Sequence, residues 1–170
     1  KAALNQLNQQ GRLIHSQQAQ RKQLQGVSLI QQSDPNFSRV LFLDFARLAY
    51  VKFHESRGGL GRKGDNSFAV APYLSPQIRE QVKAARVRVT EVIVGNVSLQ
   101  QVTGGPDHTQ VFVAFDANIV ESADGREPVR FFLSQRFVFQ RPKTAITQPP
   151  EKVLALGCPN CGSPEEPKVD

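Results

Sequence analysis

The chain has 170 residues, a net charge of +6 and 39% hydrophobic residues, which suits one domain of ordinary size with short appendages. It contains no apolar run of about 18 residues and no recognisable secretory signal, so the sequence predicts no membrane-spanning helix. Both cysteines lie close together near the end, which argues for a reducing compartment and against a disulfide framework.

The first 32 residues are rich in Gln, with ten of them, and contain no Pro. Their sparse apolar residues recur at helical spacing, and residues 1–33 carry four basic and no acidic side chains. We therefore predict an amphipathic arm over residues 1–32 that docks on its own domain, on another copy or on an anionic membrane surface. A flexible Gln-rich tail is the alternative. The residues predicted to contact a membrane or partner are Arg12, Arg21 and Lys22.

Two helix-start signals follow the arm. Asp34 as N-cap, with Pro35 as the first helical residue, predicts a helix that runs to about Glu55. Ser75 and Pro76 repeat the signal for a helix of about three turns. Gly-rich residues 57–67 between the two helices predict a loop.

From residue 86 onward the apolar period changes to two and predicts three strands, with a bulge at Gly95 and turns at 104–107 and 124–125. Gln135 interrupts the apolar face of the third strand. Helices followed by a long antiparallel sheet predict an α+β fold with the helices on one sheet face. A bulged sheet wrapped around a helix favours a cone with an apolar cavity, which the 11 Phe fit.

After a Pro-containing linker at 142–152, a short strand leads into Cys158-Pro159-Asn160-Cys161-Gly162. Two thiolates at this spacing supply half of a tetrahedral zinc site. Since only one such turn is present, we predict a truncated zinc-ribbon half at 153–170 in a piece of a longer protein, with zinc unbound unless two chains share one ion. A redox dithiol is disfavoured because two prolines follow the motif and prevent a helix.

Three features in this order resemble the Tim-forty-four-like domain family: Asp34-Pro35-Asn36-Phe37 before a Phe-rich helix, Tyr73-Leu74-Ser75-Pro76, and three long strands. That family includes the C-terminal domain of the mitochondrial inner-membrane tether of the import motor, and bacterial members with a Cys-Pro-x-Cys-Gly ribbon after the last strand. The resemblance covers about residues 34–141, within an α+β domain predicted over residues 33–141. It implies a cone-shaped nuclear-transport-factor-two-like fold with an apolar pocket, preceded by amphipathic helices that associate with membranes. The Gly-rich loop and the lack of Trp near the end of the last strand depart from the family.

The expected function is therefore that of a non-catalytic binding or scaffold domain. It would belong to a membrane-associated bacterial protein, at the cytoplasm or the cytoplasmic face of the inner membrane, and bind a protein segment or lipid chain in connection with protein translocation. A homo-oligomer through residues 1–32 is a further expectation. The residues predicted to line the pocket are Phe45, Tyr73, Phe115, Phe131, Leu133, Phe137 and Phe139.

An enzyme of the cone fold is one alternative, and its best candidate residue is Asp116, the only acid in an apolar strand. Asp116 is predicted on the face of Phe112 and Ala114. It would be either a buried general base with a raised pKa or, as we favour, a partner of an arginine across the hairpin. The candidate arginines are Arg130 and Arg136. His54 is predicted to be a solvated residue at a helix end.

Nucleic-acid binding is the third class. Arg86, Arg88, Arg130 and Arg136 could form a basic sheet face, on which Phe132 would stack a base. Acidic residues lie among them and no aromatic-platform motif is present, so we expect no nucleic-acid partner. A ribosome-associated module remains only as an alternative.

Overall fold

The computed structural model describes residues 18, 21, 23–57, 72–123 and 126–148. The elements run in the order α2 (Arg39–Glu55), α3 (Pro76–Ala84), β1 (Arg88–Gly104), β2 (His108–Ser122) and β3 (Val129–Pro142). Residues 23–33, before α2, are also helical. The predicted α+β class, with helices first and a long antiparallel sheet after them, is confirmed.

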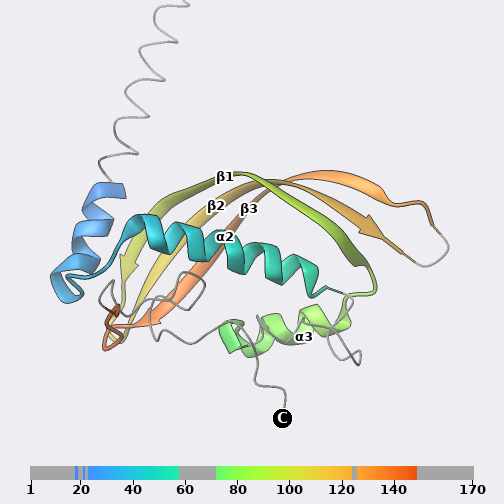
Figure 1. The fold of residues 1–170 in the computed structure, drawn as a ribbon. Helices are drawn as coiled ribbons and strands as arrows, with labels where there is room; N and C mark the ends of the chain where they lie inside the picture. Colours follow the sequence, from blue (N-terminus) through green and yellow to red (C-terminus); the bar gives the residue numbers. More distant parts are fainter. Residues whose placement is uncertain (1–17, 19–20, 22, 58–71, 124–125, 149–170) are drawn as a thin grey trace, which may run out of the picture.

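The three strands form one antiparallel sheet in the order β1-β2-β3. The pairing of β1 with β2 shifts register at three places, and the shift between Val94 and Asn96 lies at the bulge predicted for Gly95. Bulges increase the twist of a strand and bend it. Figure 1 shows the result, a curved sheet with α2 and α3 both on its concave side. We call the side facing α2 the inner face and the opposite side the outer face.

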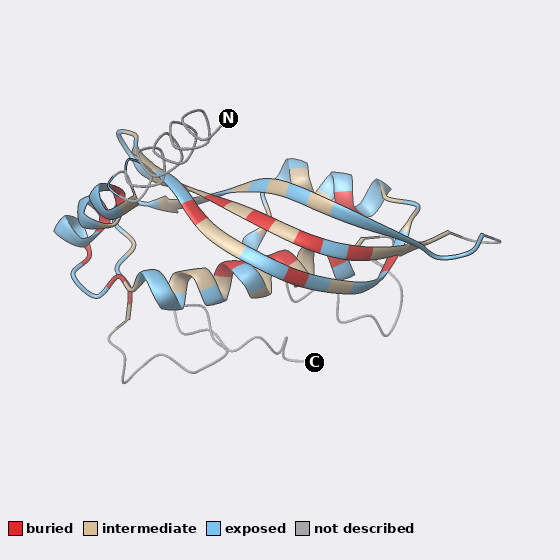
Figure 2. Cartoon of the chain, turned by 90° about the horizontal axis from the view of Figure 1, so that it is seen from above, coloured by how far each residue is buried: buried red, intermediate tan, exposed pale blue. Residues whose placement is uncertain are grey.

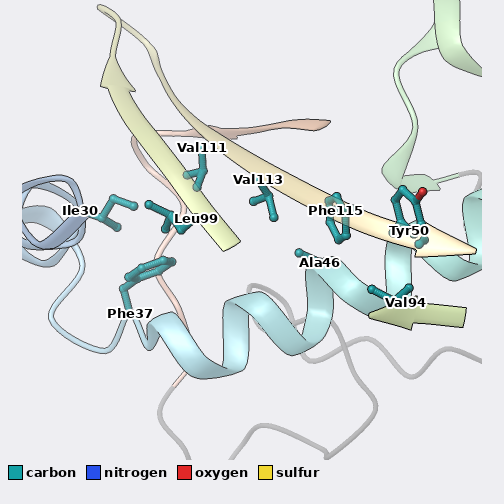
Figure 3. Close-up of a cluster of buried hydrophobic side chains, with 10 residues drawn as sticks. Ile30, Phe37, Ala46, Tyr50, Val94, Leu99, Val111, Val113 and Phe115 are labelled. Carbon is teal, nitrogen blue, oxygen red and sulfur yellow. The ribbon is translucent and has the colours of Figure 1, made fainter. Parts of the chain in front are cut away.

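The core lies between the inner face and α2. Alternate residues of β2 are buried, as the period of two predicts, and Figure 2 shows this alternation along the strand. Val113 and Phe115 point from β2 toward Ala46 and Tyr50 of α2 (Figure 3). The helix therefore buries its small and aromatic residues on the middle strand of the sheet.

The start of α2 differs from the prediction. The N-cap is Ser38, whose side chain accepts a hydrogen bond from the backbone N–H of Leu41, so the assignment of Asp34 as N-cap and Pro35 as the first helical residue is wrong. The start of α3 is as predicted. Ser75 accepts from the backbone N–H of Ile78 at 3.4 Å, and Pro76 is the first helical residue.

Asp34 instead ties the beginning of the domain to the segment that follows β3. Its buried carboxylate accepts from Arg141 Nη1 at 2.8 Å and from Thr147 Oγ1 at 2.6 Å. The backbone N–H of Thr147 donates to the same carboxylate at 3.1 Å. A long-range pairing has thus overridden the local capping signal, because a buried carboxylate needs donors that one helix end does not supply in full.

The described turns at 23–33 dock on the domain, which is one of the three predicted places for the arm. Ile30 belongs to the buried core. Gly26 faces β1 so closely that an added Cβ would lie 2.8 Å from Val102 Cγ2. The glycine that interrupts the predicted helical stripe therefore permits close approach of this helix to the sheet. Apart from residues 18 and 21, the remainder of the arm lies outside the described residues, as do most of the predicted loop at 57–67 and the turn at 124–125.

Candidate functional site

Aromatic rings from α2, β2 and β3 pack together beneath the inner face. Tyr50 stacks on Phe115 with ring centroids 4.3 Å apart, and Phe137 meets both rings edge-on. Tyr50 and Phe115 are fully buried. Phe115 and Phe137 are two of the residues predicted to line the pocket. Their rings contact each other edge-on, as side chains of a packed core do.

The other predicted pocket residues fall into two groups. Phe45 contacts the rings of Tyr73 and Phe139 at centroid distances of 5.6 Å and 6.3 Å. Phe131 and Leu133 lie on the same face of β3, nearer the β2–β3 hairpin, and Phe131 is 42% exposed. The seven residues therefore lie on the inner side of the molecule, and their exposure ranges from fully buried Phe115 to exposed Phe131 near the hairpin.

A chain of polar groups crosses this aromatic layer. Tyr50 Oη donates to Gln135 Oε1 at 2.8 Å, and His54 Nε2 lies 3.2 Å from the same oxygen. On its other side, His54 Nδ1 lies 3.4 Å from Arg57 Nη1, and Arg57 pairs with Glu121 at 2.8 Å. Gln135 interrupts the apolar face of β3 because it is the acceptor that these two α2 side chains need.

The partners of His54 determine its protonation. The amide oxygen of Gln135 only accepts, so a neutral His54 donates from Nε2 and accepts at Nδ1 from the guanidinium of Arg57. Burial and then the charge of Arg57 lower its pKa to about 4. His54 is 1% exposed, so the prediction of a solvated residue at the helix end is wrong.

Burial likewise raises the pKa of Tyr50 to about 12. At neutral pH the phenol is therefore protonated and the imidazole is neutral, and both groups are sealed from solvent. In this arrangement they hold α2 against β3. Tyr50 and Gln135 were not identified as partners from the sequence; the available signals are the i, i+4 spacing of Tyr50 and His54 and a Gln within an apolar strand face.

Asp116 lies on the outer face, as its predicted alternation with Phe115 requires. Its carboxylate accepts from Asn96 Nδ2 at 3.1 Å and from Ser134 Oγ at 2.7 Å. These hydrogen bonds, first that of Asn96 and then that of Ser134, lower its pKa. The prediction of a buried general base with a raised pKa is therefore wrong.

Pairing of Asp116 with an arginine across the hairpin is also wrong. The register places Asn96 and Ser134 directly opposite Asp116, whereas Arg130 and Arg136 lie opposite Val120 and Ala114. Each arginine has a different neighbour. Arg130 pairs with Glu91 at 3.0 Å, and the guanidinium of Arg136 lies over the ring of Phe112, 5.5 Å from its centroid.

Large apolar side chains are exposed on the outer face. Phe132 of β3 is 68% exposed, and Asn118 separates it from exposed Ile93 in the same row of the sheet. Val138, also exposed, lies opposite Phe112. We call Ile93, Phe112, Phe132 and Val138 the outer patch. Both labelled helices lie on the other side of the sheet (Figure 1).

Several predicted site residues lie outside the described part of the chain: Arg12, Lys22, Cys158 and Cys161. Arg21 is described and exposed. In the described ranges, no three or more His, Cys, Asp or Glu gather in a way that could hold a metal ion. The zinc half-site thus stays a prediction. None of the helices described is long and apolar enough to cross a membrane.

Comparisons with family models, with curated proteins and with solved structures gave no match. The resemblance to the Tim-forty-four-like domain family therefore stays a prediction that depends on the motifs quoted above. The site has to be interpreted from its own geometry.

Proposed function

We propose that this chain is a non-catalytic binding domain and that a protein segment docks on the outer patch. The observation that carries the proposal is the 68% exposure of Phe132 on a sheet face that already presents Ile93 and Val138 to solvent. Single exposed apolar residues are ordinary, but several on one open face are typical of interaction surfaces. Aromatic and arginine side chains, such as Phe132 and Arg136, are also enriched at interfaces.

The interior supports the same proposal. The unusual ionisable groups there, His54 and Tyr50, are buried and both hydrogen-bond to Gln135 Oε1, and the rings around them contact one another. A docking partner meets none of these groups from solvent. We therefore place the binding surface on the outer face and not in the inner pocket that the family resemblance implies.

The polar side chains of the outer face suggest what the partner looks like. Glu91 and Arg130 satisfy each other, and Asp116 is held by two neutral donors. Among the described residues, Arg136 has no carboxylate partner, and its guanidinium lies over the ring of Phe112. A segment that presents an acidic side chain beside an apolar one would pair with Arg136 and cover Phe132.

A defined peptide makes the proposal testable. A ligand selected from a random peptide library against the full chain is expected to bind through Phe132. Phe132→Ser should weaken its binding by roughly tenfold or more, as for a central interface aromatic. The matched control is Phe131→Ser, because the neighbouring Phe131 is also exposed but lies on the inner face. Fluorescence anisotropy with labelled peptide measures both effects.

Unchanged affinity in Phe132→Ser together with lost affinity in Phe131→Ser would contradict the proposal. That outcome would move the binding surface to the inner side, as the expected apolar pocket requires.

The wider setting is also a proposal. The curved sheet with helices on its concave side supports assignment to the cone-shaped nuclear-transport-factor-two-like folds. A membrane-associated bacterial protein linked to translocation is the setting that the resemblance to the Tim-forty-four-like domain family implies. Exposed Arg21 and Leu24, at the described end of the arm, support contact with an anionic membrane. Co-sedimentation with phosphatidylglycerol vesicles, but not phosphatidylcholine vesicles, is expected. Charge reversal of Arg12, Arg21 and Lys22 should abolish it, and binding that survives the reversal would count against the arm.

A further inference from the structure

The two edges of the sheet are built differently. The β1 edge is irregular, with three register shifts, and Arg47 Nη2 donates to the carbonyl oxygen of Val94 at 3.1 Å. The β3 edge is regular, since β3 pairs with β2 without a shift from Val129 to Pro142. Bulges, prolines and charged side chains are common protections of an exposed edge strand. The β3 strand has no bulge and a proline only at its last residue, Pro142, so its protection is limited to three arginines.

Within the described part of the chain, no strand pairs with the free side of β3. A long regular edge of this kind is a template for another extended strand, because its outward N–H and C=O groups need partners. The sequence of β3 then restricts which strand fits. It contains three arginines, Arg130, Arg136 and Arg141, and no acid.

We propose that β3 pairs antiparallel with β3 of a second copy of this chain, about a two-fold axis at Ser134, to give one continuous sheet. Such a contact uses the same surface on both copies and closes as a dimer. The inference goes beyond the proposed function, since it concerns the edge of the sheet. Both proposals use Phe132 and Arg136, so a second copy and a docked segment would compete for these two side chains.

Charge selects this register. When a two-fold axis relates two antiparallel strands of one sheet, residues directly opposite each other lie on the same face. One residue of β3 therefore lies opposite its own copy, and each possible axis is named by that residue. An axis at Leu133 sets Arg130 opposite Arg136, and an axis at Arg136 sets two Arg136 side chains opposite each other, both of which are unfavourable. An axis at Ser134 sets Arg136 opposite Phe132 of the second copy and Arg130 opposite its Val138.

This register also covers the most exposed ring of the outer patch. Arg136 already lies over one ring of its own chain, Phe112, at 5.5 Å. In the dimer its guanidinium would reach Phe132 of the second copy, a favourable cation–ring contact that occurs twice by symmetry. An axis at Gln135 sets Arg136 opposite Ser134 and forms no such contact. Of the registers compared, the Ser134 register is therefore the one that places the guanidinium of Arg136 against the exposed ring of Phe132.

A single cysteine tests the register. In a Cys158→Ser/Cys161→Ser background, Ser134→Cys places two cysteines opposite each other on the axis, with Cβ atoms about 4.5–5.5 Å apart. Mild oxidation is expected to give a disulfide-linked dimer. The control is Gln140→Cys on the same face of β3, whose two copies would lie roughly 40 Å apart. No cross-link for Ser134→Cys, or equal cross-linking for both variants, would overturn the proposed register.

Charge variants at exposed Phe132 test the contact by sedimentation equilibrium. Phe132→Glu should tighten the dimer, because Glu would face Arg136, whereas Phe132→Arg should weaken it by roughly tenfold through two like-charge pairs. Adding Arg136→Glu to Phe132→Arg should restore association. A wild-type chain that stays monomeric at all concentrations, or charge variants that change association equally, would overturn the dimer. Cross-linking at Ser134 needs no peptide, so failure of the dimer and failure of the docking proposal are separable.

Discussion

The two faces of the sheet are built from the same strands but differ in how their side chains are packed. On the inner face, the ring of Phe115 is stacked on Tyr50, and the polar atoms of His54 and Gln135 are bonded to each other. On the outer face, Asp116 is bonded to exposed neighbours and Phe132 is largely free of contacts. The comparison teaches that the side chains with the most unusual chemistry stabilise this domain, while an ordinary phenylalanine carries the surface proposed for binding.

The largest effect should come from emptying the inner face. Phe115→Ala removes a fully buried ring and is expected to lower the free energy of unfolding by about 3–5 kcal/mol. Phe112→Ala, three residues earlier on the outer face, should cost about 1 kcal/mol or less because that ring is only partly buried. Urea denaturation measures both. Equal losses would mean that the two faces are packed alike, contrary to the comparison.

Acid should destabilise the inner face through His54. Its pKa is about 4 in the folded chain and 6.5 when unfolded, so between these values the unfolded chain binds more protons. Stability from this group is fully present above pH 6.5 and is lost as the pH falls toward 4, by roughly 3 kcal/mol in all. Thermal or urea unfolding across this pH range measures the slope.

The pH slope has a control variant. His54→Gln removes the ring whose pKa burial lowers, and it should flatten the profile between pH 6.5 and 4. A slope that persists in His54→Gln would show that other groups produce the acid sensitivity.

The two hydrogen-bonded carboxylates should also differ. Asp34→Asn removes the charge that faces Arg141 and an acceptor of Thr147 in a buried site, and we expect a loss of about 2 kcal/mol. Asp116→Asn on the outer face should leave the free energy of unfolding nearly unchanged, because this carboxylate is exposed to solvent. Chemical denaturation near neutral pH compares them. A costlier change at Asp116 would show that the outer carboxylate has a structural role.

The smallest effect on stability is expected at the proposed binding surface. Phe132→Ser should alter the free energy of unfolding by about 0.5 kcal/mol or less, because the ring is already 68% exposed. The same change should nonetheless reduce peptide affinity, as proposed above. A large loss of stability would show that Phe132 supports the fold, and the affinity data would then need another variant.

Local patterns predicted the elements that depend on local chemistry. The period of two gave the strands, and Ser75-Pro76 gave the start of α3, because a cap and a pleat are decided within a few residues. The bulge at Gly95 followed for the same reason. The face on which Asp116 lies was also predictable from its alternation with Phe115.

Residues whose role depends on distant partners were predicted wrongly. Asp34 matches a capping pattern, but its actual partner, Thr147, is 113 residues away. His54 looks solvated at the end of a helix until β3 places Gln135 beside it. Burial and register arise only when the sheet closes on α2, so no short segment of the sequence contains them.

The most direct test of the central claim is a nuclear magnetic resonance titration of the full chain with the selected peptide. The account predicts that signals of the outer residues Ile93, Phe132 and Val138 shift with peptide concentration, while those of the inner residues Tyr50 and Phe115 stay in place. Shifts confined to Tyr50, Phe115 and their inner neighbours would contradict the account and place the binding site beneath the sheet.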